Sequence, residues 1–179
     1  ATGPVAAHVF ETPGTYTVAL SVFDGSNTAT AETTVTVADP DVVFAGSNTI
    51  CVGATSTPVQ GQDGCPVGAN TTQQASFSAA LGAFADTGKR VLFKHDDTFT
   101  GSSSATIAVN GPGTIGMYGV GARPKVRSSA ANIITLGAAS TVTMQDWRIV
   151  DLELDGQSST GQHGVGVGGN ADQITLLRL

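Results

Sequence analysis

The second half of the sequence is a succession of short apolar segments, and this feature restricts the possible folds more than any other. RVLFKHD, TIGMYG, NIITLG, WRIVDLELDG and QITLLRL are rich in Val, Ile or Leu, and Gly, Asn, Ser or Pro separates them. Such residues favour strands, and these segments lack the 3.6-residue period of a helix. The pattern therefore predicts an all-β region built from many short strands.

The last part of the chain also repeats loosely. Leu152 in DLELDG and Leu176 in ITLLRL occupy similar places in two apolar segments, and the short segment GVGVGG lies between them. Repeats of this size with several strands each are typical of solenoids, whose turns stack their apolar residues on one another. We expect Ile174, Leu176 and Leu179 to belong to one more such turn.

One segment, TTQQASFSAALGAFADTG, has the pattern of a helix. Thr71 with Gln74 three residues later fits a capping box, and Gly88 fits a C-terminal stop. We therefore expect a helix at about residues 73–86. Its apolar face would consist of residues spaced i, i+3, i+4 and i+7, namely Phe77, Ala80, Leu81 and Phe84.

The first forty residues have a different pattern. In TYTVALSVFDGSNTATAETTVTV, from Thr15 to Val37, apolar and polar residues alternate on both sides of a turn at residues 24–27. Alternation with period two predicts two half-buried strands, and the turn makes them a hairpin. A further short strand is expected at His8–Phe10, before the tight turn Pro13-Gly14.

The charges also divide the chain into two parts. The residues before Lys89 contain seven acidic residues and no Lys or Arg, whereas all eight basic residues lie from Lys89 onwards. This asymmetry indicates two modules, with a linker at residues 40–42. No apolar run is long enough to span a bilayer, and we expect neither membrane insertion nor nucleic-acid binding.

Two cysteines, Cys51 and Cys65, lie in a segment rich in Gly, Thr and Pro. Two thiols without a nearby His are too few for a zinc site, so a disulfide is expected. In the chain-entropy model a loop of this size is stabilised by about 3 kcal/mol. A disulfide also implies an oxidising compartment, which places the protein outside the cell or at its surface.

The N-terminal residues resemble the last third or half of a PKD domain, an immunoglobulin-like β-sandwich. The residues that carry this resemblance are His8-Val9-Phe10, Pro13 to Val18, Leu20, Val22, Asp24 and Thr34 to Val37. The Trp-Asp-Phe-Gly-Asp-Gly signature usual in that family is missing. The resemblance covers residues 1–39 and implies either a spacer or a carbohydrate or surface contact.

Residues 43–179 resemble the N-terminal part of a right-handed parallel β-helix of the pectate-lyase-like superfamily. The resemblance implies that the helix caps the open end of the solenoid. Asp96 stands where relatives often have Gly. The residues that carry this resemblance are Phe77 to Phe84, Gly88 to Lys94, Asp97 to Phe99, Gly116 to Gly119, Gly121, Pro124, Val126 and Asp151 to Gly156.

Three carboxylates, Asp151, Glu153 and Asp155, would share one face if WRIVDLELDG were a single strand. Residues two apart on a strand are about 6.6–6.8 Å apart along it. Such a ladder can serve an inverting glycosidase, chelate Ca²⁺, or be a solvated strand face. The last interpretation is the simplest, and the other two stay open.

Six basic residues follow one another along the early strands of this region. They can form a patch that attracts an acidic polysaccharide, or they can keep the strand edges soluble. His163 is expected in a turn, and Trp147 is either a sugar platform or a packing residue. The six basic residues are Lys89, Arg90, Lys94, Arg123, Lys125 and Arg127.

These observations predict an all-β chain in which a partial immunoglobulin-like β-sandwich precedes a right-handed parallel β-helix with one N-terminal capping helix. We expect a fragment of a larger secreted or cell-surface protein that binds extracellular polysaccharide. A second hypothesis is that this protein also cleaves the polysaccharide. As a lyase or hydrolase, it would have most of its active site beyond these residues. The alternative is a non-catalytic adhesin, stalk or surface-layer protein. A complete chain of this kind would self-associate through its exposed strand edges.

Overall fold

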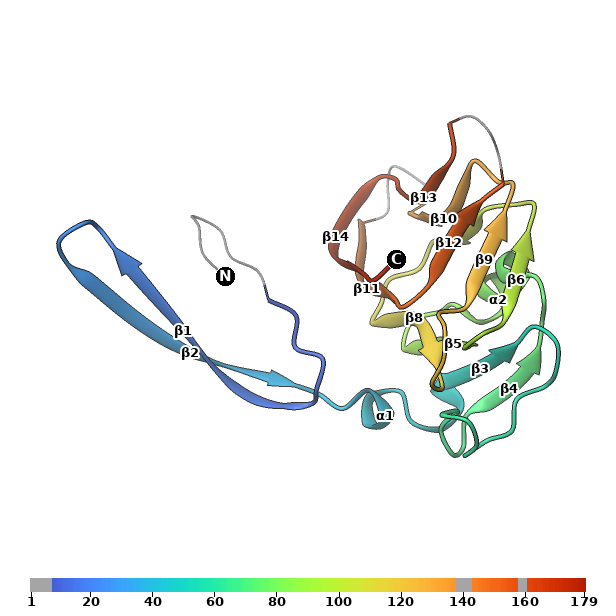
Figure 1. The fold of residues 1–179 in the computed structure, drawn as a ribbon, viewed down its shortest axis with the longest axis horizontal. Coiled ribbons are helices and arrows are strands. Elements are labelled where there is room, and N and C mark those ends of the chain that lie inside the picture. Colours follow the sequence, from blue (N-terminus) through green and yellow to red (C-terminus); the bar gives the residue numbers. More distant parts are fainter. Residues whose placement is uncertain (1–7, 138–142, 158–160) are drawn as a thin grey trace. The chain divides into compact units, whose positions relative to one another are not determined.

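A computed structural model describes residues 8–137, 143–157 and 161–179 of the chain (Figure 1). The chain divides into two units, Ala1–Val43 and Phe44–Leu179. The described residues are mostly β, with one antiparallel sheet and three parallel sheets. This confirms the prediction of a predominantly β chain. Within the described ranges, no helix has the length and apolar character needed to cross a membrane.

The first unit contains an antiparallel hairpin of β1 (Gly14–Phe23) and β2 (Thr28–Val37). Asp24 closes the turn: its N–H donates to the Asn27 carbonyl, and its carboxylate accepts from the N–H groups of Ser26 and Asn27. These hydrogen bonds lower the pKa of Asp24, because they stabilise the ionised carboxylate. The predicted hairpin is confirmed.

Other expectations for this unit differ from the structure. Residues 8–10 do not form the predicted strand, and the described residues contain one two-stranded sheet rather than the two sheets of a sandwich. Both faces of the hairpin are exposed; Leu20, for example, is 59% exposed. The prediction of a linker at 40–42 is not tested: these residues lie in the short helix α1 (Pro40–Val43), directly before the boundary between the units, and the Asp39 carboxylate accepts the Asp41 N–H.

The second unit is built from three parallel sheets. Their strand orders are β14-β11-β8-β5-β3-β4, β13-β10-β7 and β12-β9-β6. A short 3₁₀ helix, η1 (Gly46–Asn48), precedes the first strand. The strands are β3 (Thr49–Gly53), β4 (Asn70–Gln73), β5 (Lys89–Lys94), β6 (Thr98–Gly101), β7 (Ala105–Ile107), β8 (Gly113–Tyr118), β9 (Lys125–Ser128), β10 (Asn132–Leu136), β11 (Thr143–Val150), β12 (Glu153–Gly156), β13 (His163–Val167) and β14 (Asn170–Leu177).

The chain passes through the three sheets in a fixed order. β5, β6 and β7 are followed by β8, β9 and β10 and then by β11, β12 and β13, and each strand pairs with its counterpart in the next group. Figure 1 shows one such row, in which β6, β9 and β12 lie side by side. Parallel neighbours need long crossover connections, and here the strands of the other two sheets form those connections. This topology fits a parallel β-helix.

The segment WRIVDLELDG is two strands rather than one. β11 ends at Val150, and Asp151 has φ 57°, in the left-handed region, so the chain turns a corner before β12. Leu152 is fully buried at this corner. Leu176 pairs with Ile149 of β11, so Leu152 and Leu176 do not occupy equivalent places in successive turns.

The predicted helix is present but shorter: α2 spans Phe77–Phe84. Its N-cap is Ser76, whose Oγ accepts the Ala79 N–H at 3.3 Å. The expected capping box is wrong because Thr71 lies in β4, where it pairs with Cys51 of β3. Gly88 does not end the helix either, since the backbone is already extended at residue 85.

The main core lies between the three sheets, where α2 covers β5, β6 and β7. Phe93 contacts Phe77 and Phe99, with ring centroids 4.8 Å apart in both pairs. The predicted apolar helix face is confirmed: Phe84 is partly buried, and the other three residues of the face are buried, namely Phe77, Ala80 and Leu81. Trp147 is fully buried and donates its indole N–H to the Val109 carbonyl at 2.8 Å, so it is a packing residue and not a sugar platform.

Candidate functional site

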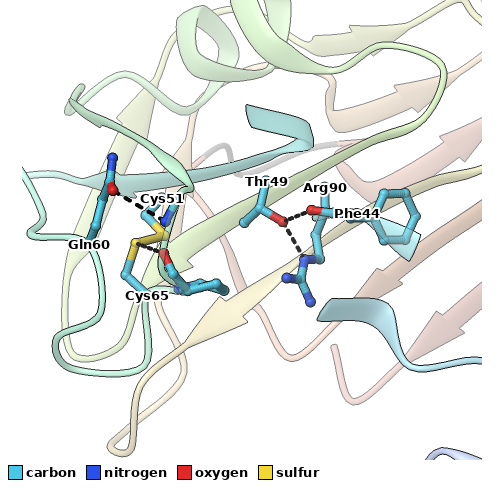
Figure 2. The surroundings of a disulfide bond; sticks show 8 residues. Phe44, Thr49, Cys51, Gln60, Cys65 and Arg90 are labelled. Atoms are coloured by element: carbon cyan, nitrogen blue, oxygen red, sulfur yellow. Dashed lines mark hydrogen bonds between the residues drawn. A yellow bond between two sulfur atoms is a disulfide. The ribbon is translucent and has the colours of Figure 1, made fainter. Parts of the chain in front are cut away.

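The loop that joins β3 to β4, residues 54–69, is called the disulfide loop below. Cys51 of β3 and Cys65 of the loop form the predicted disulfide, with Cα atoms 6.0 Å apart (Figure 2). Both cysteines pack with Ala69, Leu92 and Tyr118 in a small apolar cluster that is separate from the main core. Because strand residues alternate between two faces, this cluster fixes the loop to the outer face of the six-stranded sheet.

A cavity of about 220 Å³ lies between this loop and the sheet. Pockets for drug-sized ligands usually measure about 300–1,000 Å³, so this cavity suits a single ring-sized group. Most of its lining side chains are hydroxyl, amide or charged groups, and two are apolar. The lining residues are Ser56, Thr57, Pro58, Val59, Gln62, Asp63, Lys94 and Tyr118.

Tyr118, the last residue of β8, gives the cavity an unusual polar group. Its side chain lines the cavity and is 4% exposed, and its hydroxyl has no hydrogen-bond partner among the described residues. A buried hydroxyl without a partner costs about 1–3 kcal/mol. Burial raises the pKa of Tyr118, and the negative charges of Asp97 and Asp63 raise it further. The hydroxyl therefore stays protonated and can donate a hydrogen bond to a ligand oxygen.

The charges beside the cavity are organised around Asp63, near the tip of the disulfide loop. One of its oxygens lies 3.0 Å from His95 Nε2, and the other lies 3.3 Å from Lys94 Nζ. His95 Nδ1 lies 2.7 Å from Asp96. The bonds to Asp63 and then Asp96 raise the pKa of His95, and the His95 bond is the largest cause that lowers the pKa of Asp63. The ring therefore favours its charged form.

The six predicted basic residues do not form one patch. Lys89 binds the Ser47 carbonyl and the Asn48 side chain, and Arg90 is buried, with its guanidinium bound to Thr49 (Figure 2). The Arg90 guanidinium also lies over the Phe44 ring, 6.0 Å from its centroid. Through these contacts Lys89 of β5 binds η1, and Arg90 of β5 binds β3. Lys94 is the one member of the six that lines the cavity, and Arg123 is exposed between β8 and β9.

The remaining two basic residues meet two of the predicted carboxylates. Lys125 and Arg127 of β9 lie opposite Glu153 and Asp155 of β12, with ion-pair distances of 2.8 and 3.1 Å. The hydrogen bond to Glu153 raises the pKa of Lys125. Two of the proposed ligand-binding carboxylates are therefore partners in surface ion pairs.

The third predicted carboxylate, Asp151, is separated from the other two by the corner before β12. It binds Arg178 through both oxygens. The continuous ladder expected from one strand therefore does not form. In the part of the chain that the structure describes, no group of three or more His, Cys, Asp or Glu side chains is arranged to hold a metal ion, so no calcium site is assigned.

The residues around the cavity were not among the predicted site residues, apart from Lys94. Asp63, His95 and Tyr118 come from three segments that are distant in the sequence, and the fold brings them together. One local signal was present: Lys94, His95, Asp96 and Asp97 form a run of four consecutive titratable residues that begins at the last residue of a strand. Such a concentration of charge at a strand end is a reason to look for a site.

Comparisons with known proteins bear on the first unit. No curated protein and no solved structure matches the chain. Residues 1–39 match the family model of the PKD domain. The N-terminal resemblance is therefore confirmed, and the chain carries a PKD-like domain at its N-terminus.

Proposed function

We propose that this chain is part of an extracellular or cell-surface protein that binds polysaccharide, and that one sugar unit occupies the cavity beside Tyr118. Two features fit an extracellular location: the PKD-like domain, a type common in extracellular proteins, and the Cys51–Cys65 disulfide. An extracellular location would give the protein access to extracellular polysaccharide. The polymer-binding role is therefore compatible with the location.

We propose further that the second unit is the N-terminal part of a right-handed parallel β-helix of the pectate-lyase-like type. The recurring passage through three parallel sheets supports this assignment, as does the position of α2 against β5, β6 and β7, the strands of one passage through the sheets. Solenoids present long outer surfaces to extended ligands. Fold alone does not determine activity, so the function is argued from the cavity.

The observation that carries the proposal is the buried Tyr118 hydroxyl without a partner in the wall of a polar cavity. A sugar ring offers oxygen acceptors for this hydroxyl and further hydroxyls for Ser56, Thr57 and Gln62. Its apolar C–H face can lie against Pro58 and Val59. Lys94 and Asp63, which are paired with each other, add one positive and one negative charge to the lining.

Polymer cleavage is a separate hypothesis that the sequence raised. The cavity contains groups that can exchange protons, namely Asp63, Lys94 and Tyr118, whereas the unpartnered Tyr118 hydroxyl supports binding alone. The alternative of a non-catalytic adhesin, stalk or surface-layer protein is compatible with glycan binding. It differs from an enzyme only in leaving the polymer intact.

The test is a Tyr118→Phe variant titrated with cellotriose, mannotriose and trigalacturonic acid and followed by NMR and calorimetry. We expect the wild type to bind one of these trisaccharides and the variant to bind it more weakly by about 0.5–1.5 kcal/mol, the range of a neutral hydrogen bond. The variant should unfold at the same or a higher urea concentration, because the hydroxyl it loses has no partner. The substitution should therefore lower the affinity for the trisaccharide without lowering the stability of the ligand-free protein.

A matched control is Tyr16→Phe, which removes a tyrosine hydroxyl that donates to the Thr12 carbonyl in the first unit. This variant should bind the trisaccharide like the wild type. If none of the three trisaccharides binds the wild type, or if Tyr118→Phe binds as well as Tyr16→Phe, the proposal is wrong. The same incubations, assayed for new reducing ends and unsaturated products, test cleavage separately.

A further inference from the structure

The disulfide loop is held to the sheet at two points near its tip. One is covalent, at Cys65. The other is the carboxylate of Asp63, which bridges Lys94 and His95. Between these points Gly64 packs on the backbone of residue 119 so closely that a Cβ at Gly64 would lie 2.6 Å from the Gly119 nitrogen. The tip therefore rests directly on the end of β8, next to Tyr118.

His95 holds this tip in a way that depends on its charge. Its ring lies between Asp63 of the loop and Asp96 of the turn after β5, and each ring nitrogen is within hydrogen-bond distance of one carboxylate. A carboxylate accepts hydrogen bonds, so both contacts need an N–H group, and only the protonated imidazole has two. In a neutral ring, the lone pair of one nitrogen would face a carboxylate.

The bond to Asp63 is the one that deprotonation would break. Asp96 follows His95 directly in sequence and also accepts the Ala122 N–H at 2.9 Å, so it stays in place. The backbone of Gly119 and Gly121 packs closely against the ring, since a Cβ at either position would overlap it. The charged groups that face the ring are Asp63 from the loop and Asp96 from the turn, while Lys94 of β5 contacts Asp63. The segment after β8 faces the ring with glycine backbone.

We propose that the disulfide loop is a lid on the cavity, latched through Asp63 by protonated His95 and loosened when the ring loses its proton, which leaves Lys94 as the remaining ion-pair partner of Asp63. This inference rests on the proposed function of the cavity and adds the condition under which the cavity takes its ligand. With the latch closed, the Tyr118 hydroxyl exposes less than 1 Å². A ligand oxygen therefore reaches it only when a neighbouring segment moves; in the proposal that segment is the tip, whose movement the disulfide restricts to the residues before Cys65.

The direction of the pH effect follows from the contacts. Both carboxylates raise the pKa of His95 from its ordinary value of 6.5. The latch is therefore complete below that ordinary value and is lost as the pH rises through the higher pKa of the folded protein. Affinity for a sugar ligand should increase over the same range. We expect a change of about fivefold, the low end of typical coupling between sites, because Asp63 is half exposed.

The experiment is an NMR titration of the full chain between about pH 5.5 and about pH 9, which brackets the titration of histidine. The His95 ring and the backbone amides of residues 56–64 are followed together, and affinities for cellotriose, mannotriose and trigalacturonic acid are measured at both ends. We expect the loop amides to shift with the midpoint of the ring. His95→Gln should abolish this shift and bind at low pH as the wild type does at high pH.

The matched control is His163→Gln, the same chemical change at an exposed histidine that begins β13. In this variant the amide shifts of the disulfide loop and the trisaccharide affinity should depend on pH as in the wild type. Asp63→Asn is a second latch variant that keeps the shape of the loop residue. Loop amides that do not follow the His95 ring overturn the latch, and affinity that is independent of pH in the wild type overturns the lid. Loop amides that follow the ring without any trisaccharide binding support the latch and overturn the proposed function.

Discussion

A substitution at Gly113 tests the stacking of one turn of the second unit on the next. Gly113 of β8 pairs with Trp147 of β11, and a Cβ at position 113 would lie 2.6 Å from two carbons of the Trp147 ring. The ring is fully buried, and its indole N–H is bound to the Val109 carbonyl, so it cannot slide aside without losing that bond. The φ angle of Gly113 is not positive, so backbone strain plays no part.

Gly113→Ala should therefore destabilise the second unit by overpacking, which typically costs about 1–3 kcal/mol. For a domain of this size, the expected fall in the melting midpoint is about 2–12 °C, at about 2–4 °C per kcal/mol. Urea unfolding followed by tryptophan fluorescence measures the effect directly. Trp147 is the only tryptophan in the sequence, so the signal reports on the unit that contains it.

The matched control is Gly82→Ala in α2. Gly82 is exposed, and no heavy atom lies within 4 Å of a Cβ built there. Replacing an exposed helix glycine by alanine should stabilise by about 0.5–1 kcal/mol. The two variants thus make the same chemical change with opposite expected signs. Gly113→Ala with wild-type stability, or a loss of the same size in both variants, would refute the stacking of Trp147 on Gly113.

Two further predictions concern the disulfide and the hairpin turn. Replacing Cys51 and Cys65 by Ala, across a sequence separation of 14, should lower the free energy of unfolding by about 3 kcal/mol; a reducing agent should shift the urea midpoint of the wild type but not of this variant, and equal shifts in both would contradict the prediction. Because hydrogen bonds lower the pKa of Asp24, its contribution to the turn is present above its unfolded pKa of about 3.9 and is lost as the pH falls through the lower folded value. NMR shifts of the turn amides should show this acid transition in the wild type and not in Asp24→Asn, and a transition that persists in the variant would assign it to another group.

Local patterns predicted several elements. The apolar face of α2 follows from the sequence because it packs on the core. The alternation in β1 and β2 predicted the two strands, but not their exposure, since both faces of the hairpin are exposed. With only two cysteines in the chain, one intramolecular disulfide was the sole pairing available. These predictions needed no knowledge of how distant segments meet.

The errors arose where the local sequence was compatible with two different structures. Thr71 and Gln74 have the spacing of a capping box, but threonine also favours strands, and Thr71 finds a partner in β3. The spacing within WRIVDLELDG fits a continuous strand, but Asp151 adopts the left-handed conformation that Asp tolerates better than most residues. In both places tertiary pairing, which the local sequence does not contain, decided the outcome.

The candidate site depends on the same kind of long-range contact. His95 and Asp63 are 32 positions apart, and the path of the disulfide loop brings them together. The run of titratable residues after β5 marks the place but does not reveal its partner. Tyr118 could not be singled out from sequence, since what distinguishes it is the lack of a partner for its hydroxyl, a property of the folded environment.

The predicted carboxylate and basic sites show how the fold can pair residues that were predicted to bind separate ligands. The carboxylates of β12 and the basic residues of β9 were considered as separate ligand sites, yet the parallel register places Glu153 opposite Lys125 and Asp155 opposite Arg127. Exposed pairs of this kind contribute only about 0–1 kcal/mol each, so their main effect is to satisfy charges on neighbouring strands. A ligand that bound there would first have to displace an ion-pair partner. In the cavity beside Tyr118 the hydroxyl has no hydrogen-bond partner to give up, and the ion pair that opens there under the proposed lid is the one between Asp63 and His95. The unpartnered hydroxyl therefore makes the cavity the better candidate for recognition.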